Sequence, residues 1–152
     1  MGERLGTEAN GDDHRMAVHL RWHLNSGRDL SRVRDEVRQE LEHAGLPPAG
    51  VDDLLVVLSE LTTNGLQAAG GNRAAVTVVM GIDDEDDVVE LLIKNVGAAF
   101  DHDALAQAPQ DMPSAASATG RGLAVAAALS DELEITPLIG GTQVRVARRR
   151  TY

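Results

Sequence analysis

Residues 51–67 read VDDLLVVLSELTTNGLQ, and this stretch decides the fold. At about 100° of rotation per residue, its leucines lie on one side of a helix, whereas Glu60 and Asn64 share a polar sector on the other side. A carboxylate set between valines is costly to desolvate unless a charged or hydrogen-bonding group meets it. The pattern therefore favours a helix whose polar face lines a cleft, and an ordinary exposed helix face is the alternative that this motif alone leaves open.

The sequence on either side of this helix predicts a single α+β domain. The expected helices carry apolar residues at helical spacing and lie at 29–44, 51–69 and 120–129. The expected strands carry alternating or β-branched apolar residues and lie at 15–24, 74–82, 88–95, 132–137 and 142–147. This order predicts a two-layer sandwich, with the helices on one face of a mostly antiparallel mixed sheet.

Alternation in the first strand assigns its residues to two faces. Apolar residues occupy the even positions from Met16 to Leu24, so one face is buried. His19, Arg21 and His23 are expected on the opposite, solvated face. A metal site on the two histidines is not favoured, because no acidic third ligand is close to them in the sequence.

Length and composition narrow the class of protein. The chain has 152 residues, enough for one compact domain, and no cysteine, which excludes thiol catalysis and disulfides and suits a cytoplasmic location. A net charge of −10 and the scarcity of aromatic residues argue against direct nucleic-acid binding, and no apolar stretch is long enough to predict a membrane span. Residues 1–13 are expected to be a disordered tail, residues 14–148 the domain, and residues 149–152 a C-terminal tail.

Two glycine-containing segments border a long insertion. Residues 98–119 are too long for a passive loop in a compact domain, so we expect a mobile lid. Residues 95–97 (NVG) end a strand before this insertion, and residues 120–122 (GRG) open a helix after it. Free backbone N–H groups at a helix start, together with the charge of Arg121, could bind a phosphate, and a plain helix cap is the alternative.

In their order along the chain, these motifs resemble the ATP-binding boxes of the GHKL ATPase fold of gyrases, chaperones and histidine kinases. The motifs are SELTTN at 59–64, NVG at 95–97, TGRGLA at 119–124 and GT at 141–142. The resemblance covers residues 14–148 and is closer to the small stand-alone anti-sigma-factor serine kinases of bacteria. It implies a single domain that binds ATP and Mg²⁺.

The resemblance also implies a role for each matching residue. Glu60 would be the general base on the attacking hydroxyl, and Asn64 would hold Mg²⁺ against the phosphates. Gly97 would let adenine approach the backbone, Asn95 would face the adenine amino group, and Thr142 would contact the base or its water. The segment expected to wrap the phosphates at the far hinge of the lid comprises Thr119, Gly120, Arg121, Gly122 and Leu123.

Three positions depart from the family pattern. Asn95 stands where the family usually has Asp, so its hydrogen bond to the adenine amino group lacks charge assistance, a deficit of about 1 kcal/mol. Ala99 replaces a second glycine, and the family often has His where Ala68 stands. We therefore expect weakened ATP binding, with a larger effect on turnover than on the fold.

Three functions are compatible with these residues. The first is an ATP- and Mg²⁺-dependent protein serine kinase that binds a sigma factor and phosphorylates an anti-anti-sigma partner. The second is a protein-interaction module of the same fold whose nucleotide binding is weakened or lost. The third, a detached histidine-kinase catalytic domain, is disfavoured because the sequence shows no dimerisation helix pair with a phospho-acceptor His. The negative charge suits a basic surface on a protein partner, and homodimers are common in the resembling family.

Overall fold

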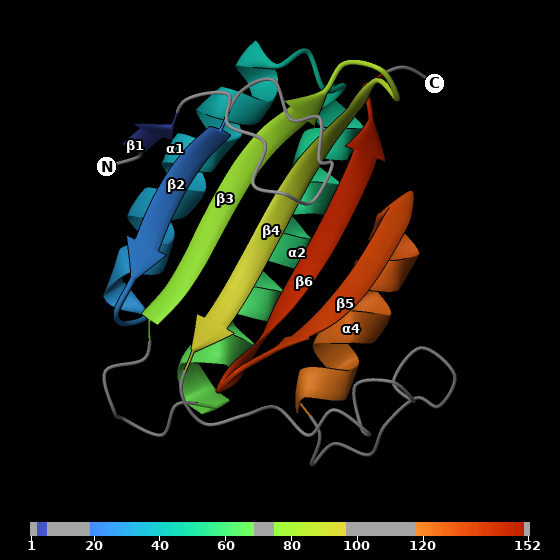
Figure 1. Cartoon of the computed structure of the whole chain (residues 1–152). Helices are drawn as coiled ribbons and strands as arrows, with labels where there is room; N and C mark the ends of the chain where they lie inside the picture. Colours follow the sequence, from blue (N-terminus) through green and yellow to red (C-terminus); the bar gives the residue numbers. More distant parts are fainter. Residues whose placement is uncertain (1–2, 6–18, 69–74, 97–117, 151–152) are drawn as a thin grey trace.

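The computed structural model of the chain describes residues 3–5, 19–68, 75–96 and 118–150 (Figure 1). Its helices are α1 (Arg28–His43), α2 (Pro48–Ala68) and α4 (Ala118–Leu129). Its strands are β1 (Glu3–Leu5), β2 (His19–Leu24), β3 (Ala75–Asp83), β4 (Val88–Val96), β5 (Glu132–Leu138) and β6 (Gly141–Arg149). Figure 1 shows these helices on one face of the sheet, which confirms the predicted two-layer α+β architecture.

The described strands form one six-stranded sheet in the order β1-β2-β3-β4-β6-β5. Each neighbouring pair is antiparallel, so the mostly antiparallel sheet that the sequence predicts is antiparallel in all its described pairings. Strands β3 and β4 are consecutive, whereas β6 reaches β4 from the far end of the chain. Figure 1 shows α2 running behind β4 and β6, and the SELTTN motif at 59–64 lies in the second half of this helix, toward the end of β4.

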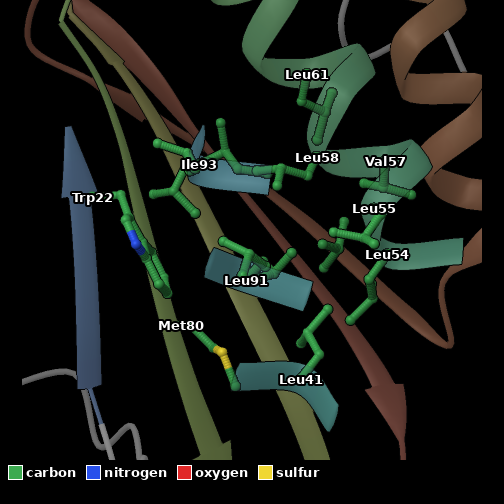
Figure 2. Packing of buried hydrophobic residues seen from close by; sticks show 14 of the residues in the cluster. Trp22, Leu41, Leu54, Leu55, Val57, Leu58, Leu61, Met80, Leu91 and Ile93 are labelled. Carbon is green, nitrogen blue, oxygen red and sulfur yellow. The ribbon is translucent and has the colours of Figure 1, made fainter. Parts of the chain in front are cut away.

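An aliphatic core fills the space between the helices and the sheet (Figure 2). Its largest fully buried side chains come from both layers and include Trp22, Val33, Val37, Leu41, Leu54, Leu55, Leu58, Leu91 and Leu123. Burying such a side chain contributes about 1.5–3 kcal/mol, so these contacts fix α1, α2 and α4 against the strands. The indole N–H of Trp22 donates to the Glu36 carboxylate of α1 at 3.0 Å, which satisfies the polar atom of the single tryptophan.

Turn residues end several elements close to the predicted positions. Gly45 follows α1 with a φ of +85°, and Gly140 joins β5 to β6 with a φ of +76°. Both angles lie in the left-handed region that glycine adopts without a steric penalty. Pro48 begins α2, where its missing N–H has no helical acceptor to lose. These local signals explain why the sequence predicts the element boundaries well.

Both ends of the described chain differ from the prediction. Residues 3–5, predicted to be part of a disordered tail, form β1 and pair with β2, because a strand edge offers backbone groups that even a polar segment can pair with. Arg149 ends β6, and Arg150 donates its backbone N–H to Asp87 O at 2.9 Å, so these two residues belong to the domain and not to a C-terminal tail.

Two further expectations need comment. His19, predicted to be solvated, is buried with 7% of its surface exposed, because strand alternation assigns a residue to a face but does not say what covers that face. Most of the predicted lid lies outside the described residues, and residues 118 and 119 belong to α4 instead. None of the helices in the described ranges is both long and apolar enough to cross a membrane.

Candidate functional site

Helix α2 places Glu60 and Asn64 one turn apart, as the sequence predicts. Asn64 is 6% exposed, and Glu60 is half-buried. Leu61, between them in sequence, points into the core in Figure 2. Asn64 is therefore buried beside the core, and Glu60 lies one turn away with part of its side chain exposed.

The first turns of α4 pack directly against the Asn64 side chain. A Cβ atom built on Gly122 would collide with Asn64 Nδ2 and would lie 3.7 Å from Leu61 Cδ2. Only a residue without a side chain fits at this position while Asn64 keeps its place. The glycine at 122 therefore lets α4 approach the amide that the sequence analysis assigns to the metal.

The ends of β4 and β6 bring two more predicted residues together under α2. Asn95 and Thr142 are direct partners in the antiparallel pairing of these strands and are 2% and 1% exposed. A Cβ atom on Gly65 would lie 3.6 Å from both Cβ and Cγ of Asn95 and 3.0 Å from Val76 Cγ2. Gly65 follows Asn64 in α2, so the helix, the two strand ends and the start of α4 converge on one region.

The Asn95 amide is the most informative group in this region. Within the part of the chain that the structure describes, neither Oδ1 nor Nδ2 has a hydrogen-bond partner, although both atoms are buried. An unsatisfied buried polar atom costs about 1–3 kcal/mol, so a folded protein rarely retains one without a reason. An adenine base, which carries both hydrogen-bond donors and acceptors on one edge, fits this vacant donor and acceptor. The donor set thus fits the nucleotide that the sequence predicts.

Comparison with known proteins identifies the family. A family model described as the histidine kinase-like ATPase domain matches residues 25–148. The chain belongs to this family. The chain also resembles the solved RsbU and RsbW domains of Rv1364c from Mycobacterium tuberculosis with a TM-score of 0.61 and 20% sequence identity, covering 90% of this chain and 34% of that one. The chain thus spans about a third of that solved chain, and the likeness shows the fold. The search of curated proteins found no match to the present chain.

The remaining predicted residues of this histidine kinase-like ATPase domain lie at the start of α4 or outside the described ranges. Thr119, Gly120 and Arg121 lie in the first turn of α4, where backbone N–H groups have no helical acceptor and the helix dipole is positive. Arg121 is exposed, which suits a contact with an anion at that helix end. Gly97 lies outside the described residues, as does Ala99.

Leu123 has a different place from the other residues of its segment. Its side chain is fully buried and belongs to the hydrophobic core. It anchors α4 against the other helices, so a contact between Leu123 and a phosphate would have to come from its backbone. The sequence motif groups Leu123 with its neighbours, but the helical period turns its side chain inward.

Sequence reasoning missed Arg148, which ties the helices of the site together. Its Nη1 donates to Asp53 Oδ2 of α2 at 2.6 Å and to Leu129 O at the end of α4 at 2.9 Å. The alternation of β6 gives a signal that could have found it, because Arg148 shares the helix-facing register of Thr142, Val144 and Val146. A cation on that face needs a carboxylate or carbonyl partner.

Arg145 forms a cluster of ion pairs outside the candidate site. On the sheet face away from the helices, Arg145 Nε donates to Glu90 Oε1 at 2.8 Å, and Arg145 Nη1 donates to Glu132 Oε1 at 3.0 Å. Burial alone would lower the pKa of Arg145, but its bonds and charge interactions with the two glutamates outweigh that effect and raise this pKa. No cluster of three His, Cys, Asp or Glu side chains suited to a metal occurs in the described ranges.

Proposed function

We propose that this protein is an ATP-binding regulator of the anti-sigma type and that it acts as a protein serine kinase on an anti-anti-sigma partner. One observation carries most of the weight: the buried Asn95 amide, without hydrogen-bond partners, lies at the point where α2 and the ends of β4 and β6 meet. The family membership and the fold of the RsbW-containing structure add to this support.

The residues around Asn95 suit the parts of ATP and Mg²⁺. Asn95 and Thr142 would hold the base, and the first turn of α4 with Arg121 would hold the phosphates. Asn64 would offer its amide oxygen to Mg²⁺, which commonly takes one or two protein ligands and completes its shell with phosphates and water. ATP would supply the γ-phosphoryl group for transfer to a serine hydroxyl.

Glu60 is the residue in this region that can take a proton. Its half-buried carboxylate lies one helical turn before Asn64. In this proposal it accepts the proton of the attacking serine hydroxyl as the new bond forms. Phosphoryl transfer depends mainly on positioning and charge neutralisation, so a weakly basic carboxylate suffices for this role.

A phosphorylation assay tests the kinase proposal. The full chain, radiolabelled ATP and Mg²⁺ are incubated with a candidate anti-anti-sigma protein, and serine labelling is followed. Glu60→Gln is expected to lower the rate about a hundredfold or more, because it removes the base without changing the side-chain shape. Glu42→Gln, the same change at an exposed position of α1, should leave it unchanged. Equal labelling by both variants would contradict the role of Glu60.

A protein-interaction module without useful nucleotide binding is the second candidate function. The observation that favours it is Asn95, which lacks the negative charge that the family usually has at this position. Calorimetry with ATP and Mg²⁺ separates the two functions. Binding that Asn64→Ala abolishes supports the nucleotide site, whereas no heat of binding at millimolar ATP supports the interaction module.

The charge of the chain bears on its protein partner. A net charge of −10 favours a basic surface, such as the nucleic-acid-binding face of a sigma factor. We therefore expect sigma-factor binding to weaken strongly as ionic strength rises, and a salt-independent complex would indicate an apolar interface instead. We also propose that the protein acts in the cytoplasm as a homodimer. Light scattering tests the oligomeric state, because it measures the mass of the protein in solution.

A further inference from the structure

The Asn95 side chain is enclosed by its neighbours but not held by hydrogen bonds. It is 2% exposed, Gly65 of α2 lies against it, and Thr142 pairs with it across the strands. Both Oδ1 and Nδ2 lack a hydrogen-bond partner. No hydrogen bond therefore decides which of the two atoms faces a ligand, and rotation by 180° about χ2 exchanges them within the same space.

An amide and a carboxylate offer different hydrogen-bonding groups to a purine base. A carboxylate presents two acceptors, whereas the Asn95 amide presents one acceptor and one donor side by side. Adenine offers a donor at its 6-amino group next to an acceptor at N1. A 6-oxopurine offers the reverse pattern, with an acceptor at O6 next to a donor at N1. At position 6 of the base, the amide can accept from the amino group or, after rotation, donate to O6, whereas a carboxylate can only accept and therefore matches the amino group alone.

We propose that Asn95 is a specificity-determining residue that lets the nucleotide site accept 6-oxopurine as well as 6-aminopurine nucleoside triphosphates. This inference rests on the proposed nucleotide-binding function. Its basis is the juxtaposition of a buried donor and acceptor, both without protein partners, at the end of β4.

A mismatched hydrogen bond decides how strongly a site discriminates between the two bases. Leaving a buried donor or acceptor unpaired lowers affinity about tenfold to a hundredfold. An amide that turns to match either base avoids this loss. The wild-type protein is therefore expected to bind ATP and inosine triphosphate with affinities that agree within about tenfold. Inosine triphosphate is the appropriate probe because it has O6 and N1–H but no 2-amino group.

Equilibrium titration of the full chain with ATP and with inosine triphosphate, each with Mg²⁺, tests the proposal. Asn95→Asp should shift the ratio of affinities toward ATP by about tenfold or more, because O6 would then face a carboxylate oxygen. Asn95→Leu, which has a similar size and no polar atoms, should weaken both nucleotides by about tenfold or more and leave their ratio near one. Thermal unfolding of each variant verifies that it is folded.

The outcomes distinguish a failure of the proposed base specificity from a failure of the proposed nucleotide binding. A wild-type preference for ATP of more than about tenfold would overturn the role of Asn95 while leaving the nucleotide site intact. Unchanged binding of both nucleotides by Asn95→Leu would also overturn it, because the amide would not contact the base. If the wild-type protein binds neither nucleotide, the proposed function fails as well. The wild-type ratio decides the question even if Asn95→Asp does not fold.

Discussion

The two ends of the β3–β4 pair place buried polar side chains in opposite situations. At the turn end, Asp83 is 8% exposed, and its carboxylate accepts the backbone N–H groups of Glu85 at 3.0 Å and Asp86 at 3.1 Å. At the other end, Asn95 is 2% exposed and has no hydrogen-bond partner. Burial is similar, but only one of the two side chains is satisfied. Asp83 therefore stabilises the turn through its hydrogen bonds, whereas Asn95 is the group to which the proposed function assigns a ligand.

The acidic turn between β3 and β4, residues 83–87 (DDEDD), is further anchored by Arg150. Arg150 Nε donates to Asp87 Oδ1 at 2.8 Å, and Arg150 Nη2 donates to Asp84 Oδ1 at 3.1 Å. The DDEDD segment therefore has a structural role in addition to its surface charge. At the Asn95 end, the polar side chains come from distant parts of the chain and converge without such mutual bonds to Asn95. The following predictions test this contrast, from the largest expected effect to the smallest.

Loss of a satisfied buried charge should have the largest effect on stability. Arg145→Met removes the guanidinium that faces Glu90, a carboxylate that is fully buried. We expect the free energy of unfolding to fall by about 3 kcal/mol in urea denaturation. Arg149→Met, at an exposed position of the same strand, should change it by less than about 0.5 kcal/mol. Similar values for the two variants would contradict a stabilising role of the ion pair.

Loss of space beside Asn64 should reduce nucleotide binding more than it reduces stability. In Gly122→Ala the new methyl group collides with Asn64 Nδ2, so the amide must move. We expect ATP affinity to fall about tenfold or more, which titration calorimetry can measure. Gly27→Ala is the matched control, because no atom lies within 4 Å of a Cβ built there. An unchanged affinity in Gly122→Ala would mean that the packing of α4 does not set the Asn64 position.

Replacing Asn95 or Asp83 by leucine compares how much each buried polar side chain contributes to stability at the two ends of the β3–β4 pair. Asn95→Leu should leave the free energy of unfolding without nucleotide unchanged or raise it by up to about 1 kcal/mol, because no hydrogen bond is lost. Asp83→Leu should lower it by about 1–2 kcal/mol, because two backbone N–H groups lose their acceptor. A loss of stability in Asn95→Leu as large as that in Asp83→Leu would show that the Asn95 amide is a structural group.

The smallest expected effect is a pH-dependent one at the start of α1. The Asn25 backbone N–H, which donates to Asp29 at 2.8 Å, is the main cause that lowers the pKa of the Asp29 carboxyl. A lowered pKa in the folded state contributes stability above the unfolded pKa, and this contribution is lost as the pH falls through the folded value. Asp29→Asn should therefore lower the Tm slightly at about pH 7, and the difference should shrink as the pH is lowered to about 2.5. An equal difference at both pH values would contradict this.

The sequence predicts the elements of this fold well because their signals are local. Alternation over the strands, helical spacing over α2 and the glycines at 45 and 140 each depend on near neighbours. The carboxylate partners of Arg148 and Arg150 are not local. Nothing near Arg148 in sequence indicates Asp53, and nothing near Arg150 indicates the acidic turn. These contacts depend on tertiary packing, which a pattern of residues does not contain.

In the candidate site, too, some features have local sequence signals and others depend on tertiary packing. The helical period is enough to place Glu60 and Asn64 on one face of α2, and the motif order is enough to group Asn95 and Thr142 with them. That Gly122 packs against Asn64, and that Asn95 lacks a protein partner, follow only from the assembled structure. The burial of Leu123 likewise depends on how α4 docks against the core. The sequence therefore predicts which residues gather but not how they contact one another.

Nucleotide-dependent thermal stabilisation tests the central claim most directly. If Asn64 and Asn95 line a nucleotide site, ATP with Mg²⁺ at about 100 times its dissociation constant should stabilise the wild-type protein by about 2.7 kcal/mol, seen as a Tm higher by several degrees. The shift should be absent in Asn64→Ala and strongly reduced in Asn95→Leu. A wild-type Tm that does not respond to millimolar ATP and Mg²⁺, or an equal shift in all three proteins, would contradict the account.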